Sequence, residues 1–165
     1  MVSANPNYLI FTKQYNDSNE SNIICSQTEE IKNCNLHNVE LRYCDFCVIR
    51  NCNFTDGLIF GQSTYLYIEN CVGIDTIRVQ DTCFTVRNCD GQKIICSNGK
   101  YDLAIDNCNF EAVKINMAES GDIIEVLNSN GNKLVVYGNF VIANVSSSHF
   151  DITYFENPYR HFYKI

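Results

Sequence analysis

Ten cysteines are the residues of this 165-residue chain best suited to chemistry, because thiols bind metals and form disulfides. Cys44 and Cys47 form one C-x-x-C pair, but the sequence has no second pair and no neighbouring pair of histidines, so a zinc site has little support. In a secreted chain ten cysteines would predict disulfides. Here five of them recur about 19 residues apart, which packing in a repeat explains without any bond.

No other group of residues points to catalysis. The sequence has no recognisable nucleophile–base pair, glycine-rich phosphate loop or metal cluster. The histidines lie far apart in the sequence: His37, His149 and His161. Four acidic residues near predicted turns are better interpreted as solvated turn residues than as catalytic groups: Asp75, Asp81, Asp102 and Asp106. The sequence therefore predicts no catalytic residue, no cofactor and no metal.

Five of the ten cysteines belong to a longer phrase that returns seven times. It consists of an aliphatic residue, a variable residue and asparagine, followed in the first five copies by cysteine. The steps between the asparagines are 18, 19, 18, 19, 21 and 16 residues. A period near 19 that tolerates small slips is typical of a stacked repeat. We expect the asparagines to form a ladder of amide hydrogen bonds at one corner, beside a column of small apolar thiols: Asn33, Asn51, Asn70, Asn88, Asn107, Asn128 and Asn144.

Each repeat contains two or three short runs with period-two alternation, such as Leu66-Tyr67-Ile68, separated by polar turn residues. No apolar face with helical spacing persists. We therefore predict an all-β, single-domain parallel β-helix (β-solenoid) of about seven coils of 18–19 residues. A meander sandwich would explain the alternation, but not the return of the same residue types in register. Glu29, at an inward position of the first copy, indicates an atypical terminal coil.

The repeat divides the chain into three parts. Residues 1–30 lack the phrase and are predicted to form an N-terminal cap or arm, residues 31–155 the β-solenoid, and residues 156–165 an aromatic C-terminal cap or docking tail. The tail residues that we expect at a docking surface are Tyr159, Arg160, Phe162 and Tyr163.

The net charge and the hydropathy of the chain indicate which partners and which cellular location to expect. The net charge of −7 argues against a surface that follows nucleic-acid phosphates. No stretch approaches the ~20 apolar residues that span a bilayer, and residues 1–7 lack the pattern of a secretory signal. We therefore expect protein partners, no nucleic acid and no membrane, in a protein that is intracellular (cytoplasmic) or part of a virion and is not secreted.

Residues 66–71 and 84–89, LYIENC and FTVRNC, resemble consecutive coils of the right-handed parallel β-helix superfamily. Over residues 31–155 the short coil is similar to the domain shared by tubulin-binding cofactor C and cyclase-associated protein. The cofactor C branch uses a glutamine-x-arginine-x-histidine motif to stimulate GTP hydrolysis, and neither Arg78 nor Arg87 lies in such a motif. The resemblance therefore implies cytoskeletal-protein binding without the arginine-finger chemistry.

Two other families share part of the pattern. The β-helix pectate lyases have longer coils and long loops that build a carbohydrate cleft, whereas every predicted turn here is short. Steps of five residues, as in Cys34-Asn35-Leu36 followed by Val39-Glu40-Leu41, look like pentapeptide-repeat proteins, but this register is soon lost.

The preferred functional hypothesis is a non-enzymatic structural or adaptor subunit that makes protein–protein contacts in a larger intracellular or viral assembly. It expects exposed sheet residues such as Tyr65, Tyr67 and Arg78 at interfaces. The alternatives are a carbohydrate-active β-helix enzyme, a lyase or hydrolase with acidic residues gathered on one face, and a cytoskeletal-protein binding module.

Overall fold

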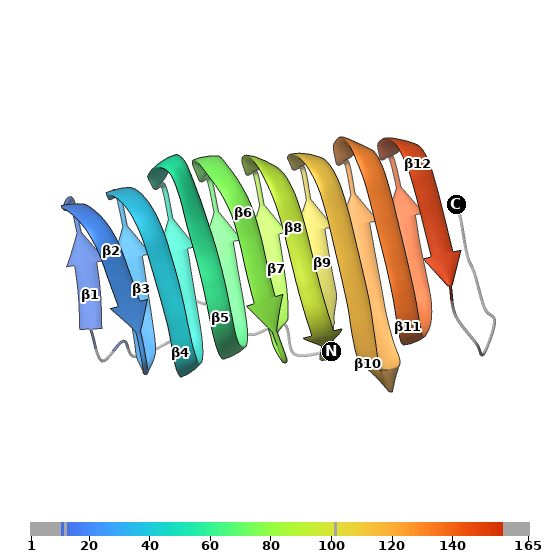
Figure 1. The fold of residues 1–165 in the computed structure, drawn as a ribbon, viewed down its shortest axis with the longest axis horizontal. Helices are drawn as coiled ribbons and strands as arrows, with labels where there is room; N and C mark the ends of the chain where they lie inside the picture. Colours follow the sequence, from blue (N-terminus) through green and yellow to red (C-terminus); the bar gives the residue numbers. More distant parts are fainter. Residues whose placement is uncertain (1–10, 12, 101, 157–165) are drawn as a thin grey trace.

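All strand pairs in the structure are parallel and join segments about one coil apart in the sequence (Figure 1). The computed structural model describes residues 11, 13–100 and 102–156 as a β-solenoid of about seven turns, which confirms the predicted fold class. No helix in this described part is long and apolar enough to cross a membrane. The strands are β1 (Lys13–Asn16), β2 (Asn19–Cys25), β3 (Thr28–Lys32), β4 (Asn35–Arg50), β5 (Asn53–Glu69), β6 (Val72–Gln80), β7 (Cys83–Arg87), β8 (Asp90–Gly99), β9 (Leu103–Asp106), β10 (Asn109–Leu127), β11 (Asn130–Ser146) and β12 (His149–Glu156).

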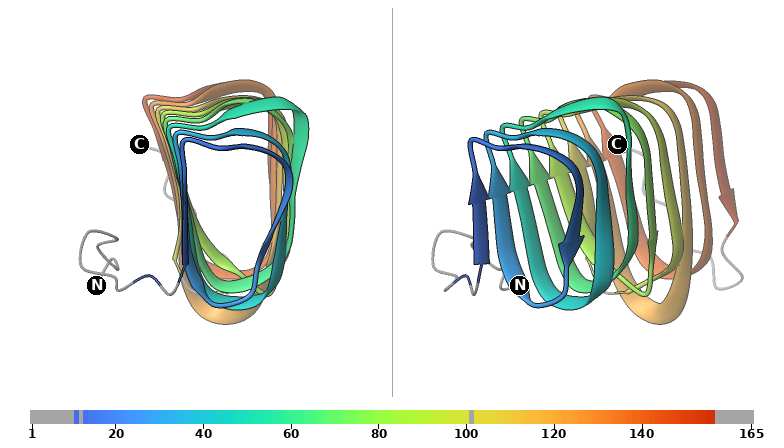
Figure 2. Two further views of the ribbon diagram at one scale, coloured as in Figure 1. Left: turned by 90° about the vertical axis from the view of Figure 1, so that its left-hand side faces the viewer. Right: turned by 60° about the vertical axis from the view of Figure 1, so that its left-hand side comes forward.

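Each coil has three straight segments, which we number from the asparagine corner onward. In the coil of residues 35–50 the register with the next coil shifts after Leu36 and again after Arg42. The first segment is therefore short, the second spans residues 38–42, and the third spans residues 46–50. The view along the stack shows these segments as the sides of a closed loop, and the chain winds as a right-handed coil (Figure 2).

The predicted period-two alternation builds the core. Leu66, Ile68, Phe84 and Val86 point inward from the third segments of two neighbouring coils and are fully buried. Because the coils are in register, each inward side chain packs on its equivalent one coil away, and burial of each large apolar side chain contributes about 1.5–3 kcal/mol.

The solenoid begins earlier than the sequence predicted. β1 and β2 pair with β3 and β4, so residues 13–25 already form part of a coil, and the predicted boundary at residue 31 is too late. Asp17 and Ser18 occupy the corner in place of asparagine and cysteine, which is why the phrase does not reveal this coil. Glu29 does lie inward, is 4% exposed, and accepts a hydrogen bond from the Ser26 amide at 3.0 Å.

The corner asparagines adopt the left-handed backbone conformation. Their φ angles are between 50° and 55°, where asparagine is tolerated better than most residues. Four amide-to-amide hydrogen bonds of 2.8–3.3 Å link the first five, from Asn33 to Asn107. The predicted ladder therefore exists over these five coils, and its side chains lie on the exposed outside of the corner.

The ladder changes partners after the 21-residue coil. Asn128 donates to the carboxylate of Asp106 at 3.0 Å instead of to Asn107. The prediction that Asn144 is the last residue of the ladder is wrong. Asn144 lies in β11 opposite Glu125, and Ser147 occupies the corner with φ 50°. The spacing from Asn128 to the corner is thus 19 residues and not 16.

The residue after each corner asparagine points inward. Each thiol in this column donates to the backbone carbonyl two residues earlier at 3.0–3.3 Å, from Cys34 to Cys108. The hydroxyls of Ser129 and Ser148 make the same bond in the last coils. The column therefore needs a small hydrogen-bond donor, and serine replaces cysteine near the ends.

Two substitutions at Asn88 distinguish the contribution of the left-handed backbone conformation to stability from that of the amide ladder. We expect Asn88→Leu to lower the free energy of unfolding by about 2 kcal/mol, since the left-handed conformation alone costs about 1–2 kcal/mol for most residues. Asn88→Gly keeps the conformation accessible and loses only the exposed amide bonds, so we expect about half that loss. Urea unfolding of both variants measures the difference, and a silent leucine variant would rule out a left-handed corner.

The thiols should be unreactive in the folded protein. All ten cysteines are buried and free. Burial, with smaller effects of Asp81 and Cys83, raises the pKa of Cys96 to about 12. Hydrogen bonds between neighbouring thiols raise the pKa of Cys71 but lower the pKa of Cys52 and of Cys89, so burial is what keeps these thiols from reagents. We expect an aromatic disulfide reagent at neutral pH to modify the cysteines only in denaturant. Rapid modification of native protein would contradict this packing.

Candidate functional site

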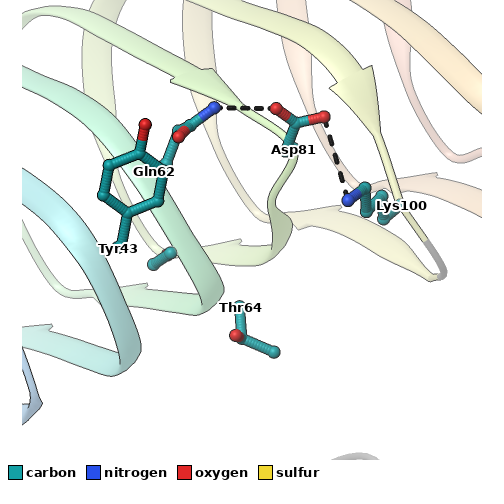
Figure 3. A pocket seen from close by; sticks show the side chains of 6 residues that line it. Tyr43, Gln62, Thr64, Asp81 and Lys100 are labelled. Atoms are coloured by element: carbon teal, nitrogen blue, oxygen red, sulfur yellow. Dashed lines mark hydrogen bonds and ion pairs between the residues drawn. The ribbon is translucent and has the colours of Figure 1, made fainter.

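A polar hollow lies at the second corner, where the second segment of each coil passes into the third (Figure 3). Its volume is about 480 Å³, and it is lined by Tyr43, Gln62, Ser63, Thr64, Asp81 and Lys100. These residues come from successive coils, so the hollow follows the stack. Tyr43 is 83% exposed and has φ 53°, an uncommon conformation for an aromatic residue.

The carboxylate in this hollow is already occupied by neighbouring side chains. Asp81 accepts hydrogen bonds from Gln62 at 2.7 Å and from Gln80 at 3.1 Å, and Lys100 Nζ lies 3.8 Å from its other oxygen. A general base needs a free lone pair directed at a substrate, so this carboxylate is poorly placed for that role. Ser63 Oγ is buried and has no hydrogen-bond partner among the described residues.

The four acidic residues noted in the sequence do not converge on one face. Asp75 lies near the start of the second segment in β6 and accepts from its neighbour Thr76 at 2.9 Å. Asp81 lies at the second corner, and Asp102 comes directly before the third segment of β9. Asp106 ends that segment and binds the Asn128 amide. Within the described residues the arrangement required by the carbohydrate-active alternative is not formed by these four.

The described histidine, cysteine and acidic side chains form no group of three or more that could hold a metal. Cys25 and Cys47 lie 3.3 Å apart at their sulfurs inside the first coils, and Cys44 is buried close to them. His37 Nδ1 is 2.8 Å from the Thr55 carbonyl oxygen, whereas His149 is 3.6 Å from Asp151 at the last coil.

A basic face runs along the outer side of the second segments of β6, β8, β10 and β11. It carries Arg78, Lys93, Lys114 and Lys133, all exposed. The register arranges them in two columns, one reading Arg78–Ile95–Lys114–Val135 and the other Thr76–Lys93–Ala112–Lys133. Cations and uncharged residues therefore alternate along each column and also along each strand. These four segments (residues 76–80, 93–97, 112–116 and 133–137) contain no aspartate or glutamate.

Apolar surface separates the cations of the basic face. A shallow hollow of about 330 Å³ lies among Lys93, Ile95, Ala112, Lys114, Lys133 and Val135. Ile95 and Val135 are half-buried, and Lys114 Nζ lies 5.5 Å from the centre of the Tyr137 ring. The face thus combines apolar contact area with positive charge.

The other sheet residues expected at interfaces behave differently. Arg78 is exposed and belongs to the basic face, but Tyr67 on the third segment is only 7% exposed. The guanidinium of Arg50 lies 5.7 Å from its ring centre, and Tyr65 is half-buried with its hydroxyl 2.7 Å from Thr85. The two tyrosines are therefore not the free surface that alternation alone suggested.

Sequence reasoning noticed only one member of the basic face. The signal was present, because the second alternating runs place a basic residue at an outward position in Ile77-Arg78-Val79 and Val113-Lys114-Ile115. Lys93 and Lys133 directly precede the corresponding inward residues. The predicted docking residues Tyr159, Arg160, Phe162 and Tyr163 lie outside the described part of the chain, so their role stays a prediction.

Comparisons with protein-family models, with curated proteins and with solved structures give no significant match.

Proposed function

We propose that this protein is a non-enzymatic structural or adaptor subunit, a β-solenoid that binds an acidic protein surface through its basic face within a larger intracellular or viral assembly. The observation that supports this most is the alternating pattern of Arg78, Lys93, Lys114 and Lys133 with uncharged residues. The tail residues 156–165 remain a second predicted docking element.

The charge distribution favours an acidic partner. The four cations give the basic face a charge of +4, so the rest of the chain carries −11, because −7 minus +4 equals −11. An acidic surface is therefore attracted by this face and repelled by the remainder, which orients the encounter. None of Arg78, Lys93 and Lys133 has an ion pair with a described residue, so a partner's carboxylates need not displace one.

The fold supports binding without rearrangement. The strands under the basic face are paired on both sides by neighbouring coils, and this hydrogen bonding fixes the backbone positions that carry the cations. A surface that is ordered before binding loses less conformational entropy when the complex forms. The apolar hollow among Ile95, Ala112 and Val135 supplies area that can be desolvated at the centre of the contact.

The other functions considered from the sequence have less support. The carbohydrate-active alternative requires acidic residues on one face, and the candidate carboxylates are spread around the coil. The cytoskeletal-binding alternative rests on the resemblance to the cofactor C domain alone, and a cytoskeletal protein with an acidic surface would suit the same basic face.

Charge reversal on the basic face tests the proposal. We expect the double variant Lys114→Glu/Lys133→Glu to bind poly-L-glutamate at least about tenfold more weakly than the native protein at low salt, a loss of about 1.4 kcal/mol. It should also lose its partner in a cross-linked pull-down from the native source. Lys32→Glu/Arg87→Glu is the matched control, because it makes the same change of −4 in net charge at two exposed residues on third segments away from this face.

Circular dichroism must first establish that both variants are folded. Equal loss of binding in the Lys32→Glu/Arg87→Glu control would indicate a general charge effect and not a site. Unchanged partner recovery with the double variant would refute binding through the basic face.

A further inference from the structure

The four cations of the basic face lie on four consecutive coils, one to a coil. Arg78 is in β6, Lys93 in β8, Lys114 in β10 and Lys133 in β11, and the second segments of these strands lie side by side (Figure 1). Neighbouring strands are about 4.8 Å apart, so the first and fourth of these residues are about 14 Å apart along the stack. The charges therefore form a row that runs along the stack and crosses the strands.

This row is a zigzag and not a straight line. Arg78 and Lys114 belong to one column, and Lys93 and Lys133 belong to the other. The two columns are two residues apart on each strand, which is about 6.6 Å. Successive cations therefore alternate between two lines about 6.6 Å apart while they advance by about 4.8 Å along the stack.

One side of an α-helix laid along the stack has the same spacing. At 1.5 Å per residue, helix positions i, i+3, i+7 and i+10 lie at about 0, 4.5, 10.5 and 15 Å, and each is within about 1 Å of one coil of the row. These four positions also alternate between two lines about 60° apart around the helix. At a helix radius of about 5–6 Å this is a separation of about 5–6 Å, close to that of the two columns.

An extended strand does not match the row. Side chains on one face of a strand repeat about every 6.6 Å, so four carboxylates on that face span about 20 Å instead of about 14 Å. They also follow a single line and leave one column of cations without carboxylates. The spacing therefore favours a helix over a strand as the acidic element.

The apolar part of the basic face fits the same helix. Helix positions i+4 and i+11 lie about 6 and 16.5 Å along the axis and within about 40° of the line that starts at i. They therefore approach Ile95 and Val135, which follow Arg78 by one and three coils in its column. Ile95 and Val135 are half-buried beside the hollow of about 330 Å³, so apolar side chains at i+4 and i+11 would fill it.

We propose that the element bound by the basic face is an acidic α-helix of a partner protein that lies along the stack. Its carboxylates occupy positions i, i+3, i+7 and i+10, and its apolar residues occupy i+4 and i+11. The inference rests on the proposed function, because it names the structure that the acidic partner presents to the same four cations. Charge complementarity then gives one ion pair to each coil.

Three labelled peptides of equal length and net charge test this inference on the full chain. The first is an alanine- and glutamine-based helix with glutamate at i, i+3, i+7 and i+10 and leucine at i+4 and i+11. The second has the same composition with its glutamates spread around the helix, and the third has proline at i+5, on the solvent side, to break the helix. Fluorescence anisotropy at low salt should give the first peptide a dissociation constant at least about tenfold below those of the others.

Exchanging two residues of the face tests the spacing in the protein itself. Lys114→Val/Val135→Lys keeps the net charge and the composition, but it leaves the β10 coil without a cation and places two on the β11 coil. We expect this variant, shown to be folded by circular dichroism, to bind the first peptide about tenfold more weakly. Its affinity for poly-L-glutamate, a flexible polyanion, should fall by about twofold or less.

The outcomes separate this inference from the proposed function. Equal binding of the three peptides, or equally tight binding of a single-stranded oligodeoxythymidylate of the same net charge, would overturn the helix. Undiminished binding of the first peptide to the exchange variant would do the same. In each case, binding of poly-L-glutamate and its loss in Lys114→Glu/Lys133→Glu would still support the basic face. Native protein that does not bind poly-L-glutamate would refute the proposed function and the helix together.

Discussion

The left-handed corner after the third segment is the constraint on which the rest of the molecule depends. A coil of about 19 residues must turn sharply at the same place in every repeat, and asparagine accepts φ near 50° with little strain. The corner also fixes register, because the amide of each corner residue donates to a carbonyl of the next coil, as Asn88 does to Asp106 at 3.1 Å. A slip of one residue would turn every inward side chain outward.

Because the corners are aligned, residues at equivalent positions of successive coils stack in columns. These columns determine which side chains lie together on the surface. Once the corners are aligned, insertions are absorbed elsewhere in the coil, as the register shift between Met117 and Asp122 shows in the long β10 coil. Lys93, Lys114 and Lys133 then fall on one flat face although the coils that hold them differ in length. The interior contributes thiols that act as small hydrogen-bond donors to backbone carbonyls.

The sequence was sufficient for the fold because asparagine and cysteine mark the corner in five consecutive coils. The pattern does not identify a corner where residues other than asparagine and cysteine adopt the left-handed conformation and provide the inward hydrogen-bond donor. Asp17 and Ser147 both occupy the left-handed corner, and serine replaces the thiol, so the asparagine–cysteine pattern does not identify the first coil and places the last corner at Asn144. Alternation correctly gave inward positions, but the low exposure of Tyr67 depends on contacts that no local pattern encodes. The basic face required the register between coils, which only the structure supplies.

Nuclear Overhauser contacts between backbone protons test the stacked register most directly. The structure predicts contacts that run in parallel, linking Thr85 with Ala104 and Val86 with Ile105, and continuing in the same direction to Glu125 and Val126 in the following coil. Positive φ at Asn88 and Asn107 should accompany them. An antiparallel pattern, in which one partner number rises as the other falls, would replace the solenoid with a meander and contradict the account.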